Sequence, residues 1–308
     1  MDPALENIGW TEEQWNRVCS VVTEEAQKAR VAAQILPVSG PEDANTIAVA
    51  NFTLTDIPNL AAAQPPARRL RVDSDPTLFL TTLAVNVQLR GVEVAAPDLA
   101  AALAMFRRAA NYIARLEDAL IFLGRSDPRT PPLMRFGLGL GRPAGIPDVV
   151  RITGDGDVGG IFQPLPALPN GRLQPQPVVP PVLPPERLVS KVIAAIGNLE
   201  GNGQLGPFAC VLGQELFNDS CTPTAALVLP RDRILPFLQG PLVRSTTILP
   251  NWGAVIALSG NPIEIVVASD IHVQFLQATL EPRYVFRVSE RIALRVKEDN
   301  AIALLNRA

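Results

Sequence analysis

Residues 97–124 read PDLAAALAMFRRAANYIARLEDALIFLG, the strongest structural signal in the chain. The apolar residues of this stretch recur every three or four positions, which is typical of one buried face of an α-helix. These positions are Leu99, Leu103, Phe106, Ala110, Ile113, Leu116, Leu120 and Leu123. Pro97 suits a first helical turn, Asp98 complements the positive helix start, and Gly124 suits the position just past the end. We predict a spine helix over residues 97–123, roughly 40 Å long and more than twice the average length.

A second helical pattern covers residues 11–36. Thr11 and Gln14 form a capping box, in which each side chain accepts from a backbone N–H at the helix start, and Pro37 ends the helix. Its apolar positions form one narrow stripe, made of Trp15, Val18, Val22, Ala26, Ala29, Ala33 and Leu36. This stripe must pack on the body of its own chain or on a partner, and the sequence leaves both open.

Between these helices the pattern changes to period two, which predicts strands over residues 46–55 and 77–90. Residues 58–76 are polar and rich in Ala, Pro and Arg, so we expect a projecting loop or hairpin there. A third helix is predicted over residues 185–199. The strands predicted after it are 208–212, 243–249, 254–259, 263–268, 271–278, 284–288 and 292–296. The predicted class is α+β, with one long helix against antiparallel sheet.

Residues 125–185 have no regular pattern. Within them, nearly every second or third residue of the segment 164–185 is proline, which excludes a helix or central strand and favours an extended polyproline conformation. The segment is almost uncharged and contains Val and Leu. We therefore expect it to lie along a surface or at a subunit contact.

The composition indicates contacts between subunits. The 308 residues are 47% hydrophobic and include 30 prolines, but only 19% are charged, where about a quarter is typical. Interface cores are depleted in charge, so we expect extensive subunit contacts. The net charge of -3, from 27 Lys and Arg against 30 Asp and Glu, predicts no nucleic-acid partner and no attraction to anionic lipid.

The cysteines and the N-terminal residues bear on location. Cys19, Cys210 and Cys221 are odd in number and widely spaced, so they fit neither a disulfide framework nor a metal or redox motif. Residues 1–10 contain acidic residues and no apolar core of signal-peptide length. No run of about 18 or more apolar residues predicts a membrane span. We expect a cytoplasmic protein without a membrane partner.

Few residues are candidates for catalysis. The single histidine, His272, lies in an alternating stretch without a nucleophile motif, so we interpret it as an ordinary strand residue. Cys210 lies between apolar neighbours and is interpreted as a buried thiol. We predict no catalytic, cofactor-binding or metal-binding residues, and hence no cofactor.

Two loops imitate ligand motifs. Gly137, Gly139 and Gly141 suggest a phosphate loop, but the prolines that follow forbid the helix that such a site requires. Asp155 and Asp157 suggest a calcium loop, but the later ligands and the closing glutamate are missing. Neither loop is interpreted as a binding site.

Four segments of the second half stand in a characteristic order. They are LEGNG at 199–203, GPFACVL at 206–212, VVASDI at 266–271 and YVFRV at 284–288. Together with the opening helix and its Gly40-Pro41 pair, and with the spine helix and its Glu117-Asp118 pair, they resemble the encapsulin family of compartment shells. The resemblance covers nearly the whole chain.

This resemblance implies an α+β fold of the tailed-phage (Hong Kong 97-type) major capsid protein, with an N-terminal helix, an extended loop near residues 52–72, and interleaved peripheral and axial domains. The implied segments are an N-terminal helix arm (1–40), the extended loop and peripheral strands (41–96), the spine helix (97–130), the axial domain with a Pro-rich insertion at 164–185 (131–258), and C-terminal peripheral strands (259–308).

The resemblance also implies a function. Shells of this family are homo-oligomers, typically of about sixty copies, that enclose cargo such as a peroxidase or a ferritin-like protein through a terminal targeting peptide. The implied cargo-docking candidates are Trp15, Val18, Val22 and Ala26. The implied pore-loop candidates are Asp219, Thr222, Pro223, Thr224 and Ala225, which would give a nearly neutral pore.

Two alternatives stay open from the sequence. A phage major capsid protein that packages DNA would have the same fold, but no basic inner segment or scaffolding segment is evident. A hydrolase or protease would need His272 or a cysteine for its activity.

Overall fold

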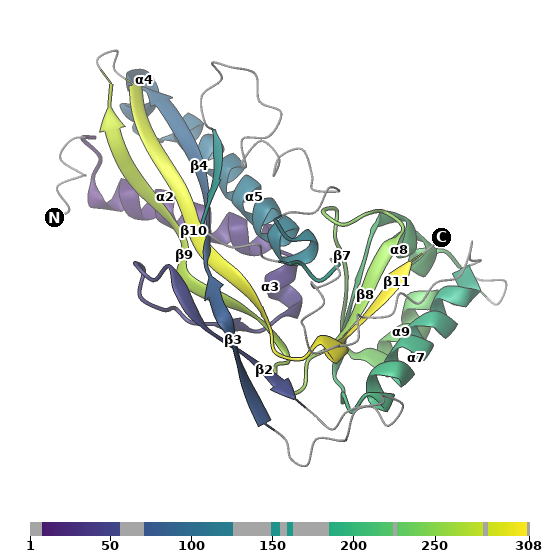
Figure 1. The fold of residues 1–308 in the computed structure, drawn as a ribbon. Coiled ribbons are helices and arrows are strands. Elements are labelled where there is room, and N and C mark those ends of the chain that lie inside the picture. The colour runs from purple at the N-terminus through teal and green to yellow at the C-terminus, as the bar shows by residue number, and fades with distance from the viewer. Residues whose placement is uncertain are drawn as a thin grey trace, which may run out of the picture.

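The structure is a computed structural model that describes residues 8–55, 71–125, 149–154, 159–162, 185–223, 227–279 and 283–306. In these ranges the chain forms two units, each with its own sheet, and a two-stranded ribbon (Figure 1). The glycine loop at 137–141, the Asp155–Asp157 turn and the Pro-rich segment 164–184 lie outside the described residues.

The first unit is built on a five-stranded sheet of order β1-β9-β10-β4-β5. Its strands are β1 (Val38–Ser39), β4 (Thr81–Arg90), β5 (Val150–Thr153), β9 (Ile263–Ala278) and β10 (Arg283–Val296). The pairs are antiparallel, except that β1 runs parallel to β9. Strands from both halves of the sequence therefore share one sheet.

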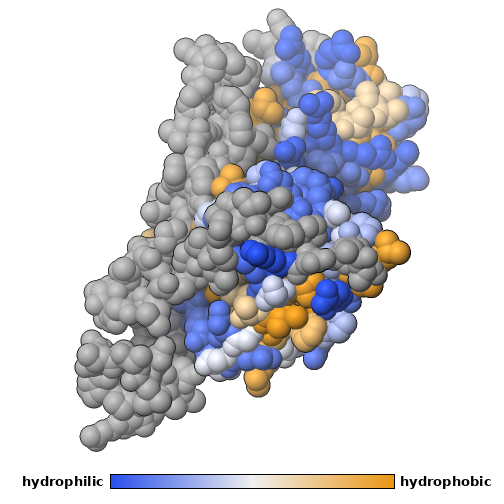
Figure 2. Space-filling model, turned by 90° about the vertical axis from the view of Figure 1, so that its right-hand side faces the viewer, coloured by the Kyte–Doolittle hydropathy of each residue, from blue (hydrophilic) through white to orange (hydrophobic). Residues whose placement is uncertain are grey.

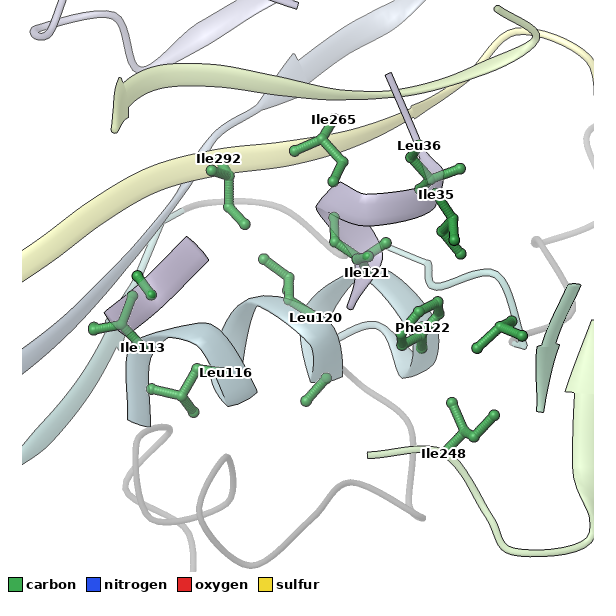
Figure 3. Packing of buried hydrophobic residues seen from close by; sticks show 14 of the residues in the cluster. Ile35, Leu36, Ile113, Leu116, Leu120, Ile121, Phe122, Ile248, Ile265 and Ile292 are labelled. Atoms are coloured by element: carbon green, nitrogen blue, oxygen red, sulfur yellow. The ribbon is translucent and has the colours of Figure 1, made fainter. Parts of the chain in front are cut away.

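The helices of this unit are α2 (Glu12–Ala29), α3 (Ala32–Ile35), α4 (Gly91–Val94) and α5 (Ala100–Leu123). The spine helix α5 packs on β4 and β10, and α2 packs on α5 and β9 (Figure 1). The apolar positions predicted for the spine are buried, so its stripe is the centre of the core. Figure 3 shows Leu120 and Ile121 of α5 on the side of the helix that faces Ile265 and Ile292 of the sheet.

The helix ends differ from the predicted ends. The spine begins at Ala100 rather than at residue 97, because Leu99 adopts a left-handed conformation with φ of 52° and Asp98 accepts a hydrogen bond from the Ala100 N–H. Gly124 ends it as predicted, with φ of 75°. The predicted helix over 11–36 is two helices, because Arg30 is extended between α2 and α3.

The ribbon consists of β2 (Ala48–Thr55) and β3 (Arg71–Phe79), which pair antiparallel. The predicted strand 46–55 is confirmed as β2, but its partner β3 begins within the predicted loop, and most of the predicted strand 77–90 is β4 of the five-stranded sheet. The predicted strand 77–90 is divided at Leu80, which is buried and donates its N–H to the Ile47 carbonyl where the chain passes from ribbon to sheet. Residues 58–70 of the loop predicted over 58–76 lie outside the described ranges, and residues 71–76 are strand.

The second unit has a four-stranded sheet of order β11-β8-β6-β7 and three helices. They are α7 (Pro185–Gly201), β6 (Phe208–Leu212), α8 (Gln214–Cys221), α9 (Pro230–Leu238), β7 (Gln239–Arg244), β8 (Trp252–Ala257) and β11 (Ile302–Asn306). The prediction assigned residues 259–308 to the peripheral part, but β11 pairs with β8, so the last strand belongs to this second sheet.

Several predicted strands have other bounds. The strands predicted at 263–268 and 271–278 are one strand, β9, and those at 284–288 and 292–296 are one strand, β10. Both apparent gaps coincide with register shifts near Ser289 and Arg291, where β-bulges interrupt the alternation without ending the strand. The strand predicted at 243–249 is wrong, because β7 ends at Arg244.

One continuous core joins the two units. The ring of Phe122 on α5 lies 6.1 Å from that of Phe162, which lies 6.0 Å from the ring of Trp252 on β8. Figure 3 shows Ile248 of the second unit beside Phe122. The backbone N–H groups of Ile161 and Phe162 donate to carbonyls of the last spine turn, which satisfies acceptors that a helix end otherwise leaves open.

Candidate assembly and docking surfaces

Residues at both ends of the opening helix α2 stabilise it. Thr11 and Gln14 form the predicted capping box, with Thr11 N–H donating to the Gln14 side chain at 2.9 Å and Gln14 N–H to the Thr11 hydroxyl at 3.2 Å. Glu12 and Glu13 stand in the first turn and Lys28 in the last, as the helix dipole favours.

The four cargo-docking candidates lie on the face of α2 that packs on its own subunit. Val18, Val22 and Ala26 are fully buried in the core of the first unit. Trp15 is half-buried, and its ring lies 6.1 Å from that of Trp10. Because the body of the chain already covers the stripe, a docked peptide could reach Trp15 but not the other three in this conformation.

The outward face of α2 is polar. Its exposed residues are Glu12, Glu13, Asn16, Arg17, Ser20, Glu24, Gln27 and Lys28. A ligand at this helix would therefore meet charged groups along most of its length, with Trp15 as the apolar contact near the helix start.

A group of charged side chains lies where α2 ends. Arg30 Nε lies 2.5 Å from Glu117 Oε2, and Arg30 Nη2 lies 2.6 Å from Glu290 Oε1 and 3.0 Å from Asp270 Oδ1. Glu117 and Glu290 are 2% exposed, whereas the Asp270 side chain is 60% exposed. Burial raises the pKa of both glutamates. The charge of Glu290 raises the pKa of Glu117 further, and the charge of Asp270 does the same for Glu290, although Arg30 opposes both shifts.

Asp118 belongs to the same region and serves the short helix α3. Its carboxylate accepts from the backbone N–H groups of Val31 and Ala32, at 2.9 and 2.7 Å from Oδ1. Burial raises the pKa of Asp118 to about 6, against these hydrogen bonds. We call Arg30, Glu117, Asp118, Asp270 and Glu290 the arm junction, because together they join the opening helices to the spine and the sheet.

Sequence reasoning missed the arm junction. A signal existed: Glu117 lies four positions after Ile113 and one after Leu116, so helical spacing places a carboxylate on the apolar face of the spine. The partners of that carboxylate could not be found in this way, because they come from three other elements.

Cations of β10 and of Lys297, which directly follows it, contact the ribbon and the residues just before it. Arg291 Nη1 donates to the carbonyls of Ala44 and Thr46 at 3.0 and 3.2 Å. The charges of Arg295 and Lys297 each lie 5.5 Å from the ring centre of Phe52 on β2. Glu264 binds both of these cations, at 2.7 and 2.8 Å, so their charge is balanced.

The pore-loop candidates lie at the end of α8 and beyond it. Asp219 is in the last turn of α8, where its carbonyl accepts from the Thr222 N–H at 3.3 Å. Thr222 caps the helix end with its hydroxyl donating to the Asn218 carbonyl at 2.8 Å, and Pro223 is exposed. Thr224 and Ala225 lie outside the described residues.

Exposed apolar side chains follow on α9 and just before it. Leu227 is 86% exposed and Phe237 50%, and Val228 and Leu235 are exposed as well. Figure 2 shows the side of the molecule on which the second unit lies, where apolar patches interrupt a largely polar surface. Large side chains left in water at this density mark an interaction surface.

The residues considered for chemistry have structural partners. His272 lies in β9, with Nδ1 3.1 Å from the Ser269 hydroxyl and Nε2 3.3 Å from that of Ser289, as an ordinary strand histidine. Cys210 is fully buried, and burial raises the pKa of its thiol to about 12, so it carries almost no reactive thiolate. In the part of the chain that the structure describes, no group of His, Cys, Asp and Glu could hold a metal ion. None of the described helices is long and apolar enough to cross a membrane.

Comparison with known proteins identifies the type of fold. Residues 174–293 match the family described as "Encapsulating protein for peroxidase". These residues include most of the second unit and all of β9. None of the curated protein sequences matches the chain.

Solved structures match over nearly the whole length. A virus-like particle from Pyrococcus furiosus matches 96% of this chain and 100% of its own, with 14% identity and a TM-score of 0.65. The capsid of the Myoviridae phage XM1 matches 90% of each chain, with 12% identity and a TM-score of 0.55. The SrpI encapsulin complex from Synechococcus elongatus matches 89% of this chain and 85% of its own, with 9% identity and a TM-score of 0.51. The predicted Hong Kong 97-type fold is confirmed.

Proposed function

We propose that this chain is a shell protein of the encapsulin type, whose copies assemble into a closed, hollow compartment that encloses a cargo protein. This proposal depends on the agreement between the match to solved structures and the match to the family model. The fold is that of capsid shells along nearly the whole chain, and the family profile within it is that of encapsulating proteins.

The single chain has surfaces that contact with further copies would bury. Its β2–β3 ribbon forms a sheet separate from those of the two units, and the helix α9 exposes Leu235 and Phe237 to water. Such surfaces are stabilised when they are buried against identical neighbours in a symmetric assembly. We propose about sixty copies, the size typical of the family.

A capsid that packages DNA is the second candidate, because the XM1 capsid shares the fold. Electron microscopy of the purified protein, combined with the ratio of ultraviolet absorbance at the nucleic-acid and protein maxima, separates the two. Hollow particles of uniform size without nucleic acid support the compartment. Particles filled with nucleic acid support the capsid, and a small species of constant size contradicts both.

For the cargo we propose a peroxidase, in keeping with the description of the matched family, with a ferritin-like protein as the second choice. The cargo would dock on the inner wall through a terminal peptide, and the cytoplasm would be the location of the compartment. Trp15 is the docking candidate that keeps accessible surface, so the peptide would contact this ring and the polar face of α2.

The docking proposal predicts the effect of one substitution. Trp15→Leu should lower the amount of co-purified peroxidase severalfold, since most of the aromatic contact area is lost. The diameter of the shell should not change. The measurement is the molar ratio of cargo to shell after co-expression, with Leu205→Ser as a control, because Leu205 is 67% exposed on the second unit. Equal loading of wild type and Trp15→Leu would rule out docking at this ring.

A further inference from the structure

Four elements meet at the guanidinium of Arg30. It follows the last residue of α2, and its carboxylate neighbours are Glu117 on α5, Asp270 on β9 and Glu290 on β10. The residues 8–36, here called the N-terminal arm, therefore have their ion pairs with the body of the subunit concentrated at one cation, in addition to the apolar packing of α2. Asp118, also on α5, holds the arm a second time through the start of α3.

The charges at this point do not balance. Three carboxyl groups, those of Glu117, Asp118 and Glu290, are almost completely buried, and Arg30 is the cation beside them. Asp118 is compensated by two backbone N–H groups, which leaves Glu117 and Glu290 to share one guanidinium. A buried carboxylate without its own compensating charge is costly, and neutralisation by a proton is the usual outcome.

Buried polar atoms of the same groups also lack hydrogen-bond partners. Although Arg30 Nε and Glu117 Oε2 are only 2.5 Å apart, neither atom has an aligned hydrogen bond. Glu290 uses Oε1 for Arg30, and its buried Oε2 has no partner. A proton on either group would remove one negative charge and supply an O–H donor in a place that lacks one.

We propose that the arm junction is a proton-dependent latch, which holds the N-terminal arm on the subunit while one proton is bound by the Glu117–Glu290 pair and loosens when that proton is lost. The charged groups that face the pair are Arg30 from the link between α2 and α3, Asp118 from α5 and Asp270 from β9. The two further acids add negative charge and so favour retention of the proton. The proposal does not depend on assembly, because every group belongs to one chain.

The direction of the pH effect follows from the pKa values. The pKa of both glutamates is raised while the arm is docked, and it returns to about 4.3 when they reach water. The docked state therefore binds more protons than the released state. Its extra stability is complete below the pKa in water and is lost as the pH rises through the raised pKa. The N-terminal arm is therefore held most firmly in weakly acidic solution, and it is released more readily as the pH rises above the raised pKa.

Backbone hydrogen exchange tests this in the full-length protein. The quantity measured is the exchange rate of α2 amides divided by that of α7 amides, since base catalysis speeds both equally and cancels. One proton held with a pKa of about 7, the value to which Glu290 is raised, predicts a rise of about tenfold in this ratio between about pH 6 and about pH 9.

Two substitutions complete the design. Glu117→Gln replaces the protonated acid by a neutral group of the same shape, so the ratio should stay low and nearly constant over the same pH range. Glu24→Gln makes the same chemical change on the exposed face of α2 and should behave as the wild type. If Glu117→Gln does not fold, Glu290→Gln serves in its place. A constant ratio in the wild type, or a full rise in the folded glutamine variant, would overturn the proposal.

Discussion

At the scale of single residues, contacts distant in sequence decide where the predicted helices break. The pattern over 11–36 gives no reason for an interruption, and the proline at its end was the expected stop. The structure interrupts it at Arg30, because this side chain reaches Glu117 and Asp118 accepts from the next N–H groups. Arg30 and Glu290 are 260 positions apart, so no local pattern could reveal the pair.

Gly160 gives a prediction at this scale. A Cβ atom at this position would lie 2.2 Å from the Gly124 nitrogen and 2.4 Å from the Leu123 carbonyl carbon, both backbone atoms that cannot move aside. Gly160→Ala should lower the free energy of unfolding by about 2 kcal/mol or more, because residues 159–162 must leave the end of the spine.

The matched control is Gly197→Ala on the exposed side of α7, where a Cβ atom meets nothing within 4 Å. Alanine is the better helix former, so this variant should be more stable by about 0.5–1 kcal/mol. Denaturant unfolding measures both changes. Equal effects of the two substitutions would show that the close approach at Gly160 does not constrain the fold.

At the scale of elements, the periodic patterns predicted the long features well. The capping box, the first ribbon arm and all but the first turn of the spine stand as predicted, because each depends on neighbouring residues. The pattern gave wrong bounds where alternation fails inside a strand, as at the bulges of β10. The short helices α8 and α9 were missed, since eight or nine residues carry too little periodicity beside the prolines of α9.

The ribbon provides the prediction for this scale. Phe52 lies against Arg295 and Lys297, so Phe52→Ala removes both cation–π contacts and leaves these charges to Glu264 alone. Hydrogen exchange of β2 amides should become several times faster, corresponding to about 1 kcal/mol. Exchange in α5 should not change. Slow exchange of β2 in the variant would show that the Phe52 ring does not hold the ribbon base.

At the scale of the whole molecule, the sequence implied interleaved domains, and the sheets show how the chain interleaves. It leaves the first unit after β5, builds the second, returns for β9 and β10, and ends in β11 of the second sheet. The place of β11 could not be predicted, because residues 302–306 are a short apolar run that would fit the edge of either sheet.

The exposed surface of α9 gives the prediction for assembly. Phe237→Asp puts a charge where an apolar side chain is half exposed. The protein concentration needed for assembly should rise at least about tenfold, and the unfolding temperature of the single chain should not change. Phe237→Leu keeps an apolar side chain and should assemble normally. Sedimentation over a dilution series measures the effect. Normal assembly of Phe237→Asp would place the contact elsewhere.

The central claim is that this polypeptide is complete only as part of a closed shell. The most direct measurement is the mass of the purified particle in native mass spectrometry or mass photometry, without any cargo. The account predicts one species with the mass of about sixty chains, in keeping with closed symmetric assembly, at all but the lowest concentrations. A folded monomer of 33.1 kDa at every concentration and ionic strength would contradict it.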